Sequence, residues 1–508
     1  MTNISRWTDV AVASRDARRP SRRYPSHRRA ATMAAVSASA MLIGCAAVGP
    51  NFTHPAAPAA QGYAMAGDDP NIGPDQAAIG DQVIAEWWTL FRSPALDQLV
   101  REAIANNLTL AQARAHLAAS HEAVAAESGL FSADLSAGVQ RERANLNAFS
   151  GGAFSSGGAS GFPTNPEYNL YSVSPSVSYD LDLFGGRRRR VESLKAAAES
   201  QARELDAAYL TLTGKVVEQA LTIADATVQI RALEAIDADD QADLDILLRA
   251  QEAGGATPEQ VSTAQGLLAQ DSAAIPMQRQ RLAAARHQLA ILIGKAPSEW
   301  SPPDYDDSGA LPQTMPVSLP SQLVRQRPDI LEAEAQLHAA TAQIGVATAA
   351  LYPNITLSAN IAQNALTPQT MFSQIANSWA LGAGLTTPIF HSGELKAQQR
   401  QAQDEARAAL AAYEETVLEA FSQVDDALQA VAHDNQAYAE QDKAVQAATA
   451  RLEMTRRAVA AGGASTQDLV RSERDLRRLR QVLAQQGSAR FADAARLLLA
   501  TAAVPPKA

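Results

Sequence analysis

The chain has 508 residues and a formal net charge of −11, and this acidic balance argues against a nucleic-acid partner. Its only cysteine, Cys45, excludes an intrachain disulfide and any zinc or redox site built from several thiols. Aromatic residues make up 5% of the chain, which suits long helices packed through small side chains better than a thick globular core.

The first 44 residues are predicted to be a signal peptide. Residues 1–29 are rich in arginine, and a stretch of small and apolar residues follows them from Ala30 to Gly44. A basic segment followed by a short apolar run is typical of a secretory signal rather than a membrane anchor. The basic segment is long for such a signal, which leaves Met33 open as a start site besides Met1.

Cys45 stands at the end of this apolar stretch, in the sequence Leu42-Ile43-Gly44-Cys45. These four residues resemble the cleavage box of bacterial lipoproteins, in which the cysteine is acylated and becomes the first residue of the mature chain. Ala46 follows in place of aspartate, which in such lipoproteins implies sorting to the outer membrane. The alternative is a buried free cysteine beside an ordinary signal peptide.

The mature part of the chain repeats its order of elements. QLVREAIANN from Gln98 matches QLVRQRPDIL from Gln322, and RAQEAGGATPEQV from Arg249 matches RAVAAGGASTQDLV from Arg457. Each half reads as a helix, a strand pair, a very long helix, a Gly-Gly turn and a helix, which indicates a tandem duplication. The order predicts six parts: a signal peptide (1–44), a lipidated extended segment (45–92), a first repeat (93–295), a linker or equatorial segment (296–319), a second repeat (320–502) and a C-terminal tail (503–508).

Four strands are predicted, one pair in each half. Apolar and polar residues alternate in 134–140, 171–182, 354–361 and 379–386, the period of strands with one apolar and one polar face. A soluble sandwich would need more strands than the four that this chain provides. A membrane barrel needs at least about eight strands, so one chain cannot close a barrel by itself. Subunits must therefore share a barrel, and an open channel favours three copies with twelve strands over two copies with eight.

Two helices are predicted to be unusually long. No proline occurs from 186 to 253 or from 393 to 461, and about 100 Å of helix fits in each stretch. Such lengths suggest coiled-coil packing. Each long helix is followed by a shorter one that returns along it, so the sequence predicts two helical hairpins. Pro276 lies inside the first returning helix and is expected to break or kink it.

The turn of each hairpin is predicted from its glycines and helix caps. Gly-Gly pairs suit the left-handed backbone that ends a helix, and Thr-Pro-Glu-Gln and Ser-Thr-Gln-Asp read as capping boxes that start the next one. The residues concerned are Gly254, Gly255 and Thr257 in the first turn, and Gly462, Gly463, Ser465 and Asp468 in the second.

Four stretches together resemble one family: CAAVGPNFTHPAAP, EWWTLFRSPALDQLVREAIANN, SYDLDLFGGRRRR and LVRQRPDILEAEAQLHAATAQIGVATAALYPNITL. In this order, and with the duplication, they resemble TolC-type outer-membrane efflux proteins of the NodT-like branch of lipoproteins. The resemblance implies an α+β membrane protein: a homotrimeric, twelve-stranded outer-membrane β-barrel, continued by a long periplasmic α-helical barrel of coiled-coil hairpins. It also implies a periplasmic adaptor protein and an inner-membrane pump of the RND type as partners.

The same resemblance assigns roles to single residues. Cys45 would carry N-palmitoyl and S-diacylglycerol lipid, and no other cofactor or metal is expected. The two Gly-Gly turns, with Thr257 and Ser465, would dock the adaptor. Asp468 either completes the cap of Ser465 or, as the resemblance implies, joins an acidic ring that narrows the closed aperture. Arg471, one turn further, departs from the acidic or neutral residue usual there.

Other conspicuous residues have simpler interpretations. The arginine run 187–190 is expected to be solvated at the periplasmic rim of the barrel, and Trp87 and Trp88 to be packing or interface aromatics. No catalytic constellation is found: the histidines are scattered and no G-x-S-x-G elbow occurs. The sequence therefore predicts no enzyme.

The leading functional hypothesis is an outer-membrane exit duct for drugs or other small molecules. A duct of a type I protein secretion system is the first alternative, because it uses the same fold. A non-conducting coiled-coil surface lipoprotein is the second, and the polar strand faces argue against it. The sequence identifies neither the substrate nor the particular pump.

Overall fold

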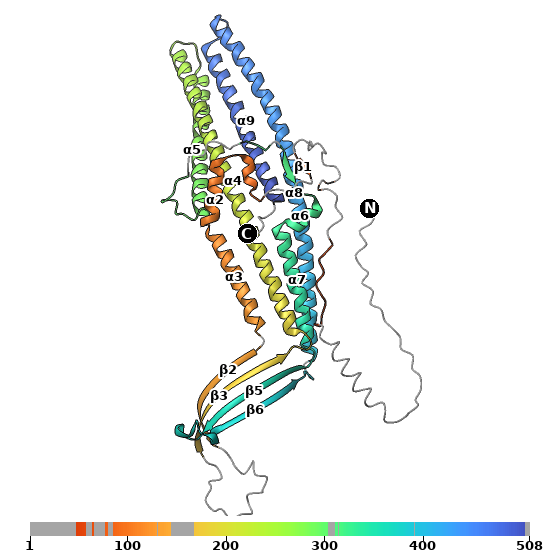
Figure 1. Cartoon of the computed structure of the whole chain (residues 1–508). Helices are drawn as coiled ribbons and strands as arrows, with labels where there is room; N and C mark the ends of the chain where they lie inside the picture. The colour runs from red at the N-terminus through yellow and green to blue at the C-terminus, as the bar shows by residue number, and fades with distance from the viewer. Residues whose placement is uncertain are drawn as a thin grey trace, which may run out of the picture. The chain divides into compact units, whose positions relative to one another are not determined.

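The computed structural model divides the chain into Met1–Ala46 and a body, Ala47–Ala508. It describes residues 47–56, 63, 65, 77–79, 85–129, 131–143, 167–302, 310–312, 314–390 and 392–502. Cys45, the predicted signal peptide and the predicted tail after 502 lie outside these residues. The account below concerns the body alone (Figure 1).

The first half of the body contains a short N-terminal strand, a 3-10 helix and four α-helices around a strand pair. In chain order these are β1 (Ala77–Ile79), η1 (Trp87–Phe91), α2 (Pro94–Asn106), α3 (Leu108–Ser128), β2 (Phe131–Arg143), β3 (Glu167–Leu181), α4 (Gly186–Glu252) and α5 (Pro258–Leu292). The second half follows the same plan after a short strand. Its elements are β4 (Met315–Val317), α6 (Pro320–Gln326), α7 (Pro328–Ala349), β5 (Asn354–Ala365), β6 (Asn377–Thr386), α8 (Ser392–Ala460) and α9 (Thr466–Thr501).

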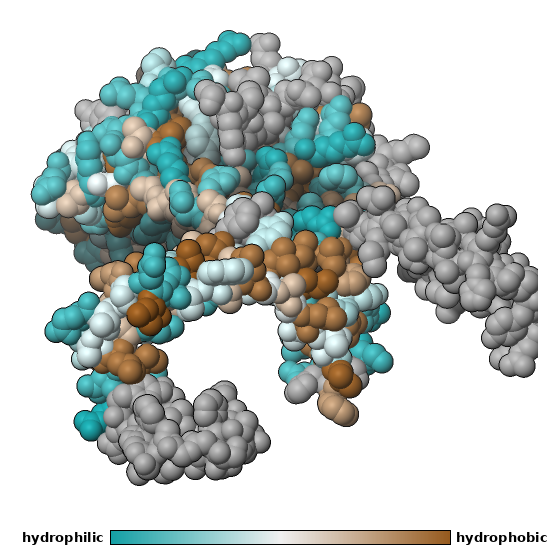
Figure 2. Space-filling view, turned by 60° about the horizontal axis from the view of Figure 1, so that its bottom comes forward, coloured by the Kyte–Doolittle hydropathy of each residue, from teal (hydrophilic) through white to brown (hydrophobic). Residues whose placement is uncertain are grey.

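The four long strands form one antiparallel sheet in the order β2-β3-β5-β6. Its register places Ser136 opposite Ser174 and Ser358 opposite Gly382, so the predicted polar residues share one face. The apolar residues lie on the other face and are exposed, with Leu381 at 74% and Leu135 at 73%. Figure 2 views the molecule from the sheet end, where brown apolar residues gather. The predicted strand alternation is confirmed.

The two long helices have the predicted extent, with 67 residues in α4 and 69 in α8. Each packs against the helix that returns along it, α5 and α9 respectively, and α4 also packs against α9. Small apolar clusters fill each hairpin near its tip, for example Leu244, Leu247 and Val261 between α4 and α5. No helix among the described residues combines the length and the hydropathy needed to cross a membrane.

One prediction about these helices is wrong in part, because α5 continues through Pro276 without a break. Proline removes one backbone hydrogen bond and crowds the carbonyl of the residue four positions before it. Pro276 lies on the exposed side of α5, where water can solvate a freed carbonyl, while Ile275 beside it is buried. Packing of α5 along α4 therefore keeps the helix intact.

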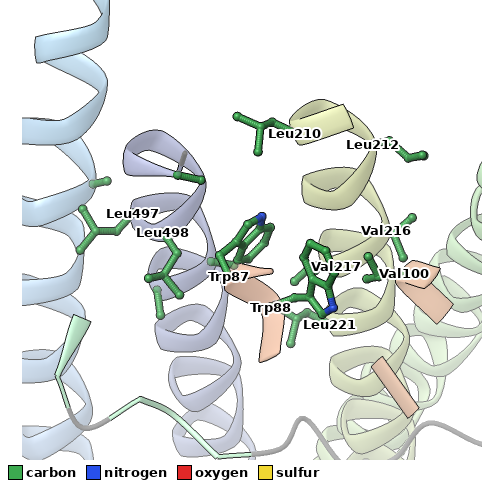
Figure 3. Close-up of a cluster of buried hydrophobic side chains, with 14 of the residues drawn as sticks. Trp87, Trp88, Val100, Leu210, Leu212, Val216, Val217, Leu221, Leu497 and Leu498 are labelled. Atoms are coloured by element: carbon green, nitrogen blue, oxygen red, sulfur yellow. The ribbon is translucent and has the colours of Figure 1, made fainter. Parts of the chain in front are cut away.

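The main core lies at mid-height of the helices, around η1 (Figure 3). Trp87 and Trp88 are at most 1% exposed and lie between α4 and α9, near Val217 and Leu498. Both indole nitrogens donate hydrogen bonds: Trp87 to the Thr213 hydroxyl at 3.3 Å, and Trp88 to the carboxylate of Asp97 in α2 at 3.0 Å. This burial confirms the packing interpretation of the tryptophan pair. The two hydrogen bonds supply the partner that a buried indole N–H needs.

Short parallel pairing ties the N-terminal segment to the linker between the halves. Strand β1 pairs with β4, Ala77 opposite Met315 and Ile79 opposite Val317. Val317 is fully buried against the main core, where it clusters with side chains of the two hairpins. The linker and the N-terminal segment thus lie together beside the core at mid-height.

Candidate functional site

The hairpin tips end their long helices in the predicted way. Gly254 and Gly462 have φ of +77° and +73°, the left-handed backbone that glycine adopts without a steric penalty. The N–H of Gly255 donates to the Ala250 carbonyl at 2.7 Å, and the N–H of Gly463 donates to the Ala458 carbonyl at 2.8 Å. These bonds satisfy carbonyls that a helix end would leave unpaired.

The predicted capping boxes start both returning helices. The Thr257 hydroxyl accepts from the Gln260 N–H at 3.2 Å, and the Gln260 side chain accepts from the Thr257 N–H at 2.9 Å. Ser465 and Asp468 repeat this exchange at 3.1 and 2.9 Å. The hydrogen bonds from the Ser465 hydroxyl and N–H lower the pKa of the Asp468 carboxyl. Asp468 therefore completes the cap, as one of its two interpretations requires, while its carboxylate stays exposed.

A line of ion pairs joins the two hairpins where α4 packs against α9. Asp243 is 3.5 Å from Nε of Arg471, and Asp240 is 3.3 Å from Nη1 of Arg474. Asp239 forms a third ion pair, at 2.5 Å from Nε of Arg477. We call these contacts the seam. Arg471, at the position where the resemblance implied an acidic or neutral residue, thus pairs with α4. The seam could not be predicted from the sequence, because the two residues of each ion pair are more than 220 positions apart.

The polar face of the sheet is lined by small uncharged residues. Across the strands it carries Ser136, Ser172, Ser174, Ser176, Ser178, Thr356, Ser358, Asn360, Gly382 and Gly384. Asp134 and Asp180 are the only ionisable side chains on this face within 133–141, 169–181, 354–365 and 377–386, and Thr356 donates to Asp180 at 2.6 Å. Such a face can border water, while the opposite face suits hydrocarbon.

The expectation that the arginine run 187–190 is solvated is wrong for two of its members. Arg189 is 3% exposed, and its guanidinium donates to the carbonyls of Val48 and Gly49 and to the side chain of Asn51. Arg187 donates to the Glu127 carbonyl at 2.8 Å, which caps the end of α3 beside the start of β2. Burial alone would make a charge costly, but these hydrogen bonds satisfy it.

Residues 47–54, which we call the strap, lie in a seat built by α4 and α7. The Val48 N–H donates to the Phe184 carbonyl at 3.0 Å, and the ring of Phe52 stacks on His338 at 4.4 Å. A Cβ on Gly49 would come within 2.5 Å of the Gly345 backbone, so only glycine allows this approach. The strap thus starts beside the helix-side end of β3.

No group of three or more His, Cys, Asp or Glu side chains is placed to hold a metal ion within the described ranges. The features that stand out are a sheet with one apolar and one polar face, two open sheet edges, and two hairpins with capped tips. Together they define a chain of the membrane-channel class, in which a four-stranded sheet is continued by long helical hairpins.

Comparison with known proteins agrees with this class. The family model described as "Outer membrane efflux protein" matches residues 99–295 and 319–503, so the chain belongs to that family. It is 29% identical to "Nodulation protein T" of Rhizobium leguminosarum bv. viciae over 86% of each chain. It is 30% identical to "Pyoverdine export outer membrane protein OpmQ" of Pseudomonas putida, over 78% of this chain and 83% of the relative.

The fold is also that of a solved channel. The structure of the outer-membrane channel OprN superposes with a TM-score of 0.77 at 24% identity, over 90% of this chain and 99% of that one. The chain is thus an outer-membrane channel of the efflux class, and this family membership sets it among channels rather than enzymes.

Proposed function

We propose that three copies of this chain form one outer-membrane duct that exports small molecules. The observation that carries the proposal is the four-stranded sheet with two open edges, β2 and β6. Consecutive strands of the sheet are antiparallel, so β2 and β6 run in opposite directions. The β6 edge of one copy can therefore pair antiparallel with the β2 edge of the next, which removes every open edge.

The faces of the sheet support a duct that has twelve strands. Eight strands leave an interior that side chains fill, whereas twelve leave room for solutes. Serine, glycine and asparagine on the polar face would line a wide, weakly interacting lumen. Exposed Leu135, Trp379 and Leu381 on the other face would contact lipid. A non-conducting tether has no use for such a polar face.

The strap supports an orientation for the duct. Cys45, which we propose to be acylated, precedes Ala47 by two residues, a covalent reach of about 7 Å. Since the strap starts beside the end of β3, the acyl chains would enter the membrane at the helix-side end of the sheet. That end would face the periplasm, and the helices would extend into it.

The tips support docking of a periplasmic adaptor that joins the duct to an inner-membrane pump of the RND type. Gly254, Gly255, Gly462 and Gly463 have no side chains, and a Cβ on Gly254 or Gly462 would meet no atom within 4 Å. The partner would therefore contact backbone and the caps of Thr257 and Ser465. In this scheme residues 1–44 are the leader, 93–295 and 320–502 are the two channel-forming repeats, and 296–319 form a belt that connects them.

Asp468 is proposed to narrow the closed aperture as well as to cap α9. Three carboxylates near one axis repel each other and attract cations. Asp468→Asn removes this charge, and we expect a higher single-channel conductance in planar bilayers with a weaker dependence on salt. Ser465→Ala is the matched control, because it weakens the same cap by about 1 kcal/mol and keeps the carboxylate. Equal conductance increases in both variants would assign the effect to the cap and refute the charged aperture.

A deletion strain tests the export function. We expect greater accumulation of lipophilic drugs, dyes or organic acids, an unchanged set of secreted proteins, and recovery on complementation. The class of compound that accumulates would indicate the pump. A missing secreted protein with normal accumulation would instead assign the duct to protein secretion, and unchanged behaviour in both assays would favour a non-conducting lipoprotein.

A further inference from the structure

A cavity of about 1080 Å³ lies where the sheet meets the helices (Figure 1). Its walls are the end of β3 with the start of α4, the end of α7 with the start of β5, and the link from β6 to α8. Asp180, Asn354 and Thr386 line it, and all three lie on the polar face of the sheet. The cavity, which we call the junction cavity, therefore opens on the side of the sheet that can border water.

The junction cavity is separate from the seat of the strap. Arg187 and Arg190 of α4 line the cavity, whereas Arg189 donates to the strap. Positions three apart share one face of a helix, and the position between them turns to another side. The strap thus lies beside a different face of α4 and leaves the cavity open.

The charged side chains of the junction cavity are mostly acidic. Four carboxylates and two guanidinium groups line it: Glu127, Asp180, Asp182, Glu394, Arg187 and Arg190. Both arginines are engaged at Glu127, since Arg187 donates to its carbonyl at 2.8 Å and Arg190 lies 3.9 Å from its carboxylate. Asp182 accepts from the first N–H groups of α4, at 3.1 and 3.0 Å, and pairs with Arg188.

The remaining two carboxylates, Asp180 and Glu394, are exposed. Within the described ranges neither forms an ion pair, and their hydrogen-bond partners are neutral: Thr356 for Asp180 and Gln398 for Glu394. The junction cavity therefore offers two negative charges that no cation of the described chain neutralises.

Aromatic rings supply the apolar part of the same cavity. The rings of Phe184 and Tyr352 are stacked, with centroids 4.5 Å apart and planes at 16°, and Tyr352 is 43% exposed. Ile389 and Phe390, in the link from β6 to α8, also line the cavity and are 70% and 95% exposed. Large apolar side chains gathered at an exposed cavity are typical of a binding site.

We propose that the junction cavity binds organic cations, compounds that carry a positive charge on a flat apolar body. The flat body would stack on the ring of Tyr352 or Phe390, and a cation over such a ring is attracted by its electron-rich face. The carboxylates of Asp180 and Glu394 would attract the same charge. An organic anion would meet net negative charge, and a neutral compound would gain the apolar contact alone.

The size and place of the cavity fit this class of ligand. Sites for drug-sized compounds have volumes of roughly 300–1,000 Å³, and the cavity is of that order. In the proposed duct it would hold cations at the wall where the helical tube opens into the β-barrel. This location in the duct rests on the proposed assembly of three copies, whereas the binding of cations to the cavity does not.

The test measures dye binding to the purified, full-length oligomer in detergent without a pump, so it is independent of transport. Rhodamine 6G is a flat lipophilic cation, and fluorescein is an anion with the same ring system. Fluorescence anisotropy gives the affinity of each dye, and protein-free micelles correct for partition into detergent. We expect saturable binding of about one rhodamine 6G per chain that weakens with added salt, and at least tenfold weaker binding of fluorescein.

Two variants locate the site. Glu394→Gln removes one of the two unpaired carboxylates, and Tyr352→Leu replaces the exposed ring by an apolar side chain without a π face. Each should raise the Kd of rhodamine 6G about fivefold, the size expected of one charge contact or one cation–π contact. Fluorescein binding should not weaken in Glu394→Gln, because the lost charge repels an anion.

Each variant has a matched control outside the cavity. Glu405 is an exposed carboxylate further along α8 that bonds Gln401, much as Glu394 bonds Gln398, so Glu405→Gln removes an equal charge. Phe372 is an exposed ring between β5 and β6, so Phe372→Leu removes an equal π face. Neither control should change the affinity for rhodamine 6G.

Several results would overturn the proposal. They are no saturable binding, which would mean that a neighbouring copy fills the cavity, equal affinity for the two dyes, an unchanged affinity in both cavity variants, or equal losses in a variant and its control. If Tyr352→Leu does not assemble, Glu394→Gln decides, because its side chain is exposed. Binding that follows the expected pattern, together with normal accumulation in a deletion strain, would support this site and contradict the export function.

Discussion

Leu381→Arg is expected to prevent insertion of the channel into the outer membrane. Leu381 is 74% exposed on the apolar face of β6, between Trp379 and Leu385 on the same face. An arginine that faces lipid near the middle of a β-barrel costs about 2–4 kcal/mol per chain, and the proposed trimer carries three copies. The measurement is the yield of folded, heat-modifiable oligomer in the outer-membrane fraction, which should fall at least tenfold.

Ala380→Arg is the matched control for this prediction. Ala380 neighbours Leu381 on the same strand and points to the polar face, opposite Asn360. An arginine there would border water, so insertion should be retained, while the added positive charge in the lumen should reduce passage of cations. If both variants insert equally well, the apolar face does not contact lipid, and the assignment of the two sheet faces is wrong.

Arg189→Ala is expected to release the strap from the body. The substitution removes the buried guanidinium that donates to Val48, Gly49 and Asn51, and it leaves backbone carbonyls in the seat without donors. The strap should lose about 3 kcal/mol of binding to its seat, the order expected when buried charge-assisted hydrogen bonds are removed. Cleavage by chymotrypsin after Phe52, which stacks on His338, should become at least tenfold faster.

Arg190→Ala serves as the control because its side chain is 57% exposed and its only described ion pair, with Glu127, is 3.9 Å long. Chymotrypsin should cut this variant after Phe52 at the unmodified rate. Arg189→Lys should resemble Arg189→Ala, since an ammonium group cannot reach three acceptors as a guanidinium does. A strap that stays protected in both Arg189 variants would show that the glycine contact and the Phe52 stack suffice to hold it.

The elements that the sequence predicted well are those whose signals are local. Alternating residues in β3 and β6, the absence of proline from α4 and α8, and the Gly-Gly turns with their capping boxes each act within a few positions of the chain. The capping role of Asp468 could be predicted for the same reason. The family resemblance then supplied the way in which these elements assemble.

The features that were missed depend on contacts between distant parts of the chain. Arg189 looked like one member of a solvated run, and only the fold brings the strap, about 140 residues earlier, to its side. The seam pairs Asp240 with Arg474 across 234 residues. A signal was present, since acidic residues in α4 and arginines in α9 recur at helical spacing, but charge runs of this kind are common on solvated faces.

The order of strands in the sheet has a consequence for how the chain folds. The central pairing joins β3 to β5, for instance Tyr179 to Leu357, although about 180 residues, including both helices of the first hairpin, separate them. Each half of the duplication contributes only a two-stranded ribbon, which is marginally stable by itself. The β3 edge of the first half therefore stays unpaired until the second half has been exported. A chain truncated between the halves would present that edge to other chains and would be expected to aggregate.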